Sequence, residues 1–177
     1  MTQQFEHQIH EQNEMGQLFV DIGEEAFAIP IHFVKEVIEL SKITSVPMCS
    51  NIINGVINVR GSVVPVIDAA TRLGIPQYRD YDKYSCIVLY QNVDSVTDEV
   101  VTLGLIVNRV RSIEAVTESM ATNTPAFGSH VPQQYILQMI RIHNLTLPIL
   151  DMPALLDCAA INKEIVQSQR SSYGHRE

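Results

Sequence analysis

The sequence is poor in positive charge and in aromatic residues. It has 12 lysine and arginine residues against 20 aspartate and glutamate residues, a formal net charge of -8 and a pI near 5.2, and 6% of its residues are aromatic. A nucleic-acid partner favours a basic surface, and single strands also favour stacking aromatic side chains. This composition therefore argues against nucleic acid as a partner.

Long apolar runs are also lacking. No stretch approaches the roughly 18 apolar residues that a transmembrane helix requires. The first residues, MTQQFEHQIHEQNEMGQ, lack the basic start and the apolar core of a signal peptide. We therefore expect a cytoplasmic protein with no direct membrane insertion.

Cysteine is scarce, and the usual catalytic motifs are missing. The cysteines are widely spaced and lack a CxxC pattern, which favours neither a disulfide framework nor a zinc site: Cys49, Cys86 and Cys158. His7, His10 and Glu11 form a metal-like cluster, but they lie in a terminal stretch that offers nothing to orient them. GxSxG, Walker, GxGxxG and HExxH patterns are absent. We expect no catalytic residue, no metal and no cofactor.

The chain is instead rich in short runs of valine and isoleucine that are separated by turn residues. These runs predict ten strands, at 17–22, 26–31, 34–40, 55–59, 63–67, 85–90, 100–107, 110–115, 136–143 and 145–150. Gly23-Glu24 and Arg60-Gly61 are placed at hairpin turns. Helical signals are short, at 51–54, 68–73 and 151–156.

The second half of the sequence repeats the first. GVINVRGSVVPVIDAATRL (55–73) aligns with QMIRIHNLTLPILDMPALL (138–156) at an offset of 83 residues, and AIPIHFVKEV (28–37) aligns with GLIVNRVRSI (104–113) at an offset of 76. Apolar positions, a proline and an aspartate coincide. Two copies of one five-strand unit are implied, at about 17–74 and 84–157.

A five-strand unit is expected to close as a small barrel, because closure removes exposed strand edges. The predicted fold is all-β, with two pseudo-repeated five-stranded β-barrels packed together and a few short helices. Residues 16–158 form the body, between a flexible N-terminal tail at 1–15 and a polar C-terminal tail at 159–177. The repeated prolines, Pro65 and Pro148, are predicted at sheet edges or bulges, because proline has no N–H for a ladder.

Two aspartates could be imagined as an acid and base pair. Asp68 and Asp151 each end an apolar run, and a small hydrolase that uses one of them is an alternative function. Each also directly precedes a short helical stretch, where its carboxylate can accept hydrogen bonds from free backbone amides. We interpret both aspartates as helix caps.

Two charges interrupt apolar runs. An unpaired charge in an apolar interior is costly, so Arg60 and Glu36 are predicted to meet across neighbouring strands as a partly buried, bidentate ion pair. Around Glu36, Ile31, Val34 and Val37 are spaced by three, whereas strict alternation puts Val34 and Val37 on opposite faces. Either this strand is buried on both sides, or one apolar face is free for a partner.

These motifs resemble a known family. The pattern G-V-I-N-x-R-G-x-x-x-P-V-x-D, the upstream V-x-E-V-I-E and the internal duplication, in this order, are similar to the CheW-like domains of bacterial chemotaxis coupling proteins, over about 17–157. The resemblance implies two SH3-like barrels and a non-catalytic adaptor at receptor arrays beneath the inner membrane. Its partners would be methyl-accepting chemotaxis receptors and the regulatory domain of the histidine kinase CheA. A coupler for a non-motility chemosensory array is an alternative.

The resemblance also implies roles for individual residues. Glu36 and Arg60 match a charged pair that is important for signalling in the family. Five apolar residues match a groove that receives the hairpin tip of the receptor: Leu18, Ile31, Val34, Val37 and Val107. The segment 40–46 is expected to take part in kinase binding through Leu40, Ile43 and Val46.

Overall fold

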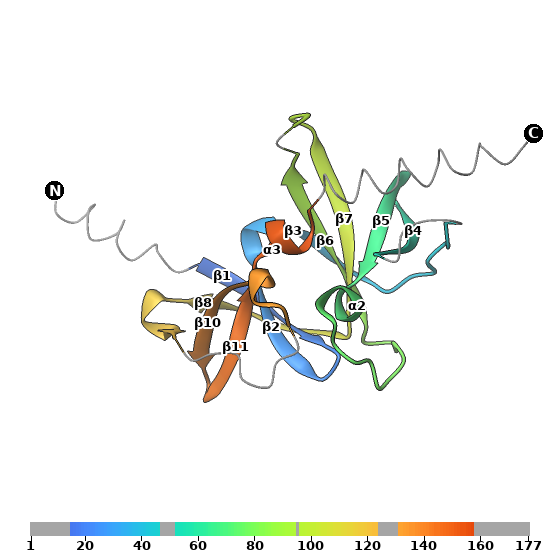
Figure 1. Ribbon diagram of the computed structural model, residues 1–177. Coiled ribbons are helices and arrows are strands. Elements are labelled where there is room, and N and C mark those ends of the chain that lie inside the picture. The colour runs from blue at the N-terminus through green and yellow to red at the C-terminus, as the bar shows by residue number, and fades with distance from the viewer. Residues whose placement is uncertain (1–14, 47–51, 95, 124–130, 158–177) are drawn as a thin grey trace, which may run out of the picture.

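The computed structural model describes residues 15–46, 52–94, 96–123 and 131–157. These residues form two curled β-sheets, called barrel A and barrel B below, which Figure 1 shows packed side by side. The predicted tails, 1–15 and 159–177, lie outside the described residues apart from Met15, as do Cys49, Cys158 and the cluster around His7.

Barrel A is a sheet of six strands. They are β1 (Met15–Ile22), β2 (Glu25–Pro30), β8 (Arg109–Val116), β9 (Ala121–Thr122), β10 (Ile136–Ile142) and β11 (Leu145–Leu150). Their order across the sheet is β8-β1-β2-β11-β10-β9. Strand β9 has two residues and was not predicted, because it carries no run of strand-forming side chains. One barrel therefore has one strand more than expected.

Barrel B is a sheet of five strands. They are β3 (Val34–Glu39), β4 (Ile53–Val59), β5 (Ser62–Asp68), β6 (Cys86–Val93) and β7 (Val100–Val107), in the order β3-β6-β7-β5-β4. All ten predicted strands are thus confirmed, with shifted ends. The helix expected at 51–54 is wrong in its described part, because Ile53 and Asn54 begin β4.

Each barrel takes strands from both halves of the sequence. Barrel A combines β1 and β2 with strands from the second half, and barrel B combines β3, β4 and β5 with β6 and β7. The expectation that each repeat closes into its own barrel is therefore wrong. The exchange occurs because η1 (Ile31–Phe33) carries the chain from β2 in one sheet to β3 in the other.

The duplication persists in the pairing of the strands. A parallel pair joins the halves in each sheet, with Val66 opposite Gly104 in barrel B and Ile149 opposite Ala28 in barrel A. Pro65 precedes the first of these pairs by one residue, and Pro148 precedes the second. Their strands, β5 and β11, lie inside the sheets, so the predicted edge position is wrong. The predicted alternative, a bulge, lies beside each proline, because the register of each hairpin shifts at the next residue pair.

The hairpin turns are equivalent in the two barrels. Arg60 and Gly61 have φ values of 50° and 86°, and His143 and Asn144 have 47° and 63°. Positive φ at both central residues of a two-residue turn matches the twist of the antiparallel strands that it connects. The predicted turns at Gly23-Glu24 and Arg60-Gly61 are confirmed. His143-Asn144 is the counterpart of Arg60-Gly61 in the repeat, at the offset of 83 residues.

A large core between the sheets joins the barrels. It includes Val20 and Phe27 from barrel A and Tyr90 and Leu105 from barrel B, all fully buried. Each barrel also has a smaller core of its own, around Phe19 and Leu147 in A and around Ile57 and Leu89 in B. Burial of this apolar surface against both sheets makes one unit of the two barrels.

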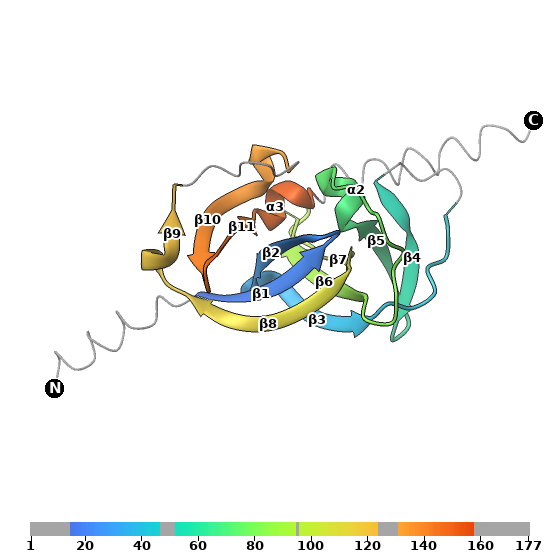
Figure 2. The same ribbon diagram turned by 90° about the horizontal axis from the view of Figure 1, so that it is seen from below.

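Two short helices, α2 (Ala69–Leu73) and α3 (Met152–Leu155), lie beside each other at the junction of the barrels (Figure 2). Asp68 accepts a hydrogen bond from the Thr71 amide at 2.9 Å, and Asp151 accepts one from the Ala154 amide at 3.1 Å. Both predicted caps are confirmed. The remaining helical turns are η2 (Glu118–Met120) and η3 (Gln133–Tyr135).

Candidate protein-interaction site

Strand β3 alternates in exposure along its length, but a β-bulge between Val34 and Glu36 changes the face on which its side chains lie. Val34, Glu36 and Ile38 are half-buried, and the residues between them are exposed. Val34 packs against the main core, whereas Ile38 packs against the smaller core of barrel B, so both sides of the strand touch a core. Neither side is fully buried, because the residues between the half-buried ones are exposed. Val37 lies opposite Val88, on the same side of the sheet as Val34, and keeps 37% of its surface accessible.

Glu36 and Arg60 form the predicted bidentate ion pair. Arg60 Nη1 donates to Glu36 Oε2 at 2.9 Å, and Nη2 donates to Oε1 at 2.5 Å. The side chains are 31% exposed for Glu36 and 70% exposed for Arg60, so the expectation of a partly buried arginine was wrong. Arg60 avoids the apolar interior because it occupies the tip of a turn.

The contact shifts the pKa values of Glu36 and Arg60 in the directions that favour their charged forms. The hydrogen bonds from Arg60 hold the pKa of Glu36 below its usual value, although partial burial acts against them. The same contact raises the pKa of Arg60. Both groups are therefore charged over the whole neutral range, and a partner that approaches this edge meets a fixed pair of opposite charges.

The ion pair joins two distant parts of one sheet. Glu36 is on β3, at one edge of barrel B, and Arg60 is in the β4–β5 turn at the other edge. A hollow of about 360 Å³ adjoins the pair, lined by Lys35, Val59, Arg60, Ser62, Val63, Val64, Leu89, Val100 and Thr102. Val63 and Val100 are 68% and 62% exposed. Neither valine was predicted as a surface residue of interest. The alternation along 63–67 does place Val63 on the face of β5 that points away from the buried Val64.

The five predicted groove residues divide into two sets. Ile31 and Val34 are half-buried against the main core, and Val37 is exposed. Leu18 and Val107 are 2% and 0% exposed, so they are core residues and present no surface to a partner. The prediction that Leu18 and Val107 line the groove is therefore wrong.

The predicted kinase-binding segment, 40–46, runs along barrel B. Leu40 and Ile43 are half-buried against its core, whereas Val46 is 36% exposed. Two hydrogen bonds of 2.9 Å hold the segment to β4, from the Thr44 amide to the Val56 carbonyl and from the Val56 amide to the Thr44 carbonyl. Gly55 permits this approach, since a Cβ there would lie 2.4 Å from the Thr44 oxygen.

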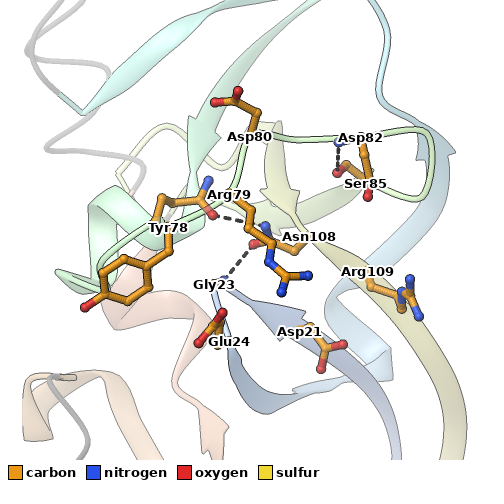
Figure 3. A pocket seen from close by; sticks show the side chains of 11 residues that line it. Asp21, Gly23, Glu24, Tyr78, Arg79, Asp80, Asp82, Ser85, Asn108 and Arg109 are labelled. Carbon is orange, nitrogen blue, oxygen red and sulfur yellow. Dashed lines mark hydrogen bonds between the residues drawn. The ribbon is translucent and has the colours of Figure 1, made fainter.

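A separate polar pocket of about 310 Å³ lies between the β1–β2 turn, the loop after α2 and the start of β8 (Figure 3). Asn108 fixes its floor by accepting from the Gly23 amide at 2.6 Å and donating to Gln77 Oε1 at 3.0 Å. Arg79 points into it. No histidine or cysteine lines the described walls of the pocket, and Ser85 Oγ there accepts a hydrogen bond from the Asp82 amide at 2.9 Å.

Other chemistry finds no further support in the part of the chain that the structure describes. No group of three or more metal-ligating side chains occurs among the described residues. None of the helices in that part is long and apolar enough to cross a membrane. Asp68 is engaged on both oxygens, by the Thr71 amide and by the Tyr81 hydroxyl at 2.7 Å.

The described residues thus form two packed β-barrels, with an exposed ion pair beside a surface hollow on barrel B. The model of the CheW-like domain matches residues 17–160, and the chain therefore belongs to the CheW-like domain family. This is a family of chemotaxis scaffold and adaptor proteins.

Individual relatives agree with this assignment. The chemotaxis protein CheW of Bacillus subtilis is 33% identical over 141 residues, which cover 79% of this chain and 85% of the relative. A probable chemotaxis protein CheW of Rhizobium etli is 31% identical over 134 residues, covering 76% and 82%. The crystal structure of the scaffolding protein TtCheW from Thermoanaerobacter tengcongensis matches with a TM-score of 0.70 at 24% identity, covering 81% of this chain and 88% of that one. This last likeness establishes the fold.

Proposed function

We propose that this protein is a non-catalytic adaptor that couples methyl-accepting chemotaxis receptors to the histidine kinase CheA. The observation that carries the proposal is the bidentate Glu36–Arg60 pair, because it sits in the family motif and is exposed at the edge of barrel B. It acts in the cytoplasm, at receptor arrays beneath the inner membrane. Its mechanism is geometric, because it holds receptor and kinase in a fixed relation and makes no bond.

The receptor surface runs along η1 and β3. Ile31, Val34 and Val37 supply aliphatic contacts for a helical hairpin tip, in a helix-in-groove mode of recognition. Leu18 and Val107 support this surface from below, since both are buried. The Glu36–Arg60 pair adjoins the same strand and fixes the orientation of the β4–β5 turn beside it.

The kinase surface lies on 40–46, directly after β3. Leu40 and Ile43 anchor this segment on the core of barrel B, and the exposed Val46 offers an apolar contact. Receptor and kinase surfaces are therefore consecutive in the chain. A shift of β3 on receptor binding reaches the kinase segment without crossing the core.

An Asp-dependent hydrolase has less support. Asp68 caps α2 and accepts from Tyr81, and Asp151 caps α3, so both carboxylates serve structural hydrogen bonds. A catalytic carboxylate would instead need a free oxygen directed at a substrate.

Sedimentation with receptor-bearing membranes and CheA tests the proposal. Wild type should co-sediment and activate the kinase, and Arg60→Ala should weaken both while the protein stays folded. Arg111→Ala is the matched control, because Arg111 makes a comparable exposed ion pair of 2.7 Å with Asp21 outside the proposed surface. Equal losses in the two variants, or no binding by folded wild type, would refute the proposed role of this edge.

A further inference from the structure

Barrel A repeats the edge-to-edge ion pair of barrel B, with a histidine in place of the arginine. His143 Nε2 and Glu114 Oε2 are 2.9 Å apart. His143 lies in the β10–β11 turn. Strand β10 is next to the short edge strand β9, and Glu114 lies on β8, the edge strand at the opposite end of the six-stranded order. We call the gap between the two ends of a curled sheet its seam, and each barrel has a side-chain contact of this kind across its seam.

The repeat relates the two contacts in detail. His143 follows Arg60 by the offset of 83 residues, and the two share a left-handed φ in equivalent turns. At the offset of 76, Ser112 takes the place of Glu36. Ser112 Oγ donates to Glu114 Oε1 at 2.9 Å, and Glu114 stands two residues further along the same face of β8. The carboxylate has thus moved by one side-chain position, and the contact across the seam is kept.

We propose that the His143–Glu114 contact is a pH-dependent clasp that closes the seam of barrel A more tightly when the imidazole is protonated. The Arg60–Glu36 contact closes the seam of barrel B without this dependence, because a guanidinium stays charged. The two barrels would then differ in how firmly they are closed as the pH changes, while the fold stays the same.

The elements around this contact carry several other charged side chains. Among the described residues, the polar contacts of Glu114 are with Ser112 and His143. On the packed elements, Arg111 of β8 is paired with Asp21 of β1, and Arg109 lies over the Tyr84 ring at 4.9 Å. The other charged side chains of the elements around the contact are Arg141 on β10 and Glu118 on η2. Gln17 is the residue opposite Glu114 on β1 and carries no charge.

The sign of the effect follows from the charges of the two groups. The hydrogen bond from His143 holds the pKa of Glu114 below its usual value, so the carboxylate stays charged well into the acid range. Histidine is the side chain that in general changes charge between about pH 5 and 8. Stabilisation of the seam is therefore largest where imidazole is protonated and falls as the pH rises. In barrel B the contact weakens only in strong acid, where Glu36 is protonated.

Native-state hydrogen exchange on the full chain, corrected for intrinsic exchange rates, measures the opening of each seam. Between about pH 5.5 and about pH 8, the opening constants of β8 and β10 amides should rise about two- to fivefold, as for an exposed ion pair, whereas those of β3 and β5 should not. His143→Arg should keep the protection and abolish its pH dependence. His143→Gln should lose both.

Two variants make the test specific. His32→Gln, an exposed histidine on η1, should leave the pH dependence of β8 unchanged. Arg60→His should transfer a pH dependence of the same sign to the seam of barrel B. The proposal is overturned if wild type and His143→Gln show the same pH dependence at β8, or if Arg60→His leaves barrel B unaffected.

Discussion

Gly55→Ala should detach the 40–46 segment from barrel B. The new Cβ would lie 2.4 Å from the Thr44 carbonyl oxygen and 2.7 Å from Ile43 Cγ2. The first atom is backbone, so a side-chain rotation cannot relieve the clash. Gly55 also has a φ of 151°, which L side chains rarely adopt. The segment must therefore move away from β4.

The cost follows from what is lost when the segment moves. The two hydrogen bonds between Thr44 and Val56 contribute about 1 kcal/mol each. Ile43 also loses part of its packing on the barrel core, about 1 kcal/mol for a half-buried side chain. We expect a loss of about 2–4 kcal/mol in the free energy that holds 40–46 in place. Because detachment relieves the clash, the free energy of global unfolding should fall by no more than this amount.

Hydrogen exchange at the Thr44 and Val56 amides measures the free energy that holds 40–46 in place. Chemical denaturation measures the free energy of global unfolding. Gly61→Asn is the matched control, since its φ of 86° also disfavours most side chains but a Cβ there meets nothing within 4 Å. Asparagine already occupies the equivalent turn position at Asn144, with a φ of 63°. Protection of Thr44 in Gly55→Ala that equals wild type would refute the close-approach argument. If 40–46 forms the kinase surface, CheA binding should fall with that protection.

The core and the caps give three further predictions. Gln17→Met should raise the unfolding midpoint by an amount worth about 1 kcal/mol, because Gln17 is 2% exposed and its Oε1 has no donor among the described residues; a lower midpoint would contradict this. Asp68→Ala should cost about 2–3 kcal/mol in denaturant unfolding, against about 1 kcal/mol for Asp151→Ala, because only Asp68 also accepts from Tyr81. Burial and the Asp68 carboxylate raise the pKa of Tyr81, so its ultraviolet titration should begin above that of exposed tyrosines and move down in Asp68→Ala.

Local features of this fold could be read from the sequence because their causes are local. Alternating valine and isoleucine runs gave ten strands, and the caps at Asp68 and Asp151 follow from an acid placed directly before a short helix. The bidentate contact of Glu36 with Arg60 was also predictable, because each charge interrupts an apolar run. Its exposure was not, since the position of Arg60 in a turn decides it.

The assignment of strands to sheets could not be predicted in the same way. A repeat in sequence shows that two units are alike, but it does not say whether each unit pairs with itself or with the other. Here β2 and β3 separate at η1, and the parallel pairs between β5 and β7 and between β2 and β11 close the exchange. The burial of Leu18 and Val107 follows from this exchange, because it places β1 and β7 against the core between the barrels.

The exchange of strands also bears on how a coupler of this kind can transmit a signal. If each repeat closed on itself, the barrels would meet only through side chains, and a shift in one could be absorbed at their interface. Because β2 of barrel A continues through η1 into β3 of barrel B, the proposed coupling would carry a displacement at Val34 along the backbone of both strands. The next described residues after β3 are those of the proposed kinase segment. Coupling would therefore require differential binding to two positions of one continuous stretch, 31–46, whose Ile31 and Val34 also pack against the main core.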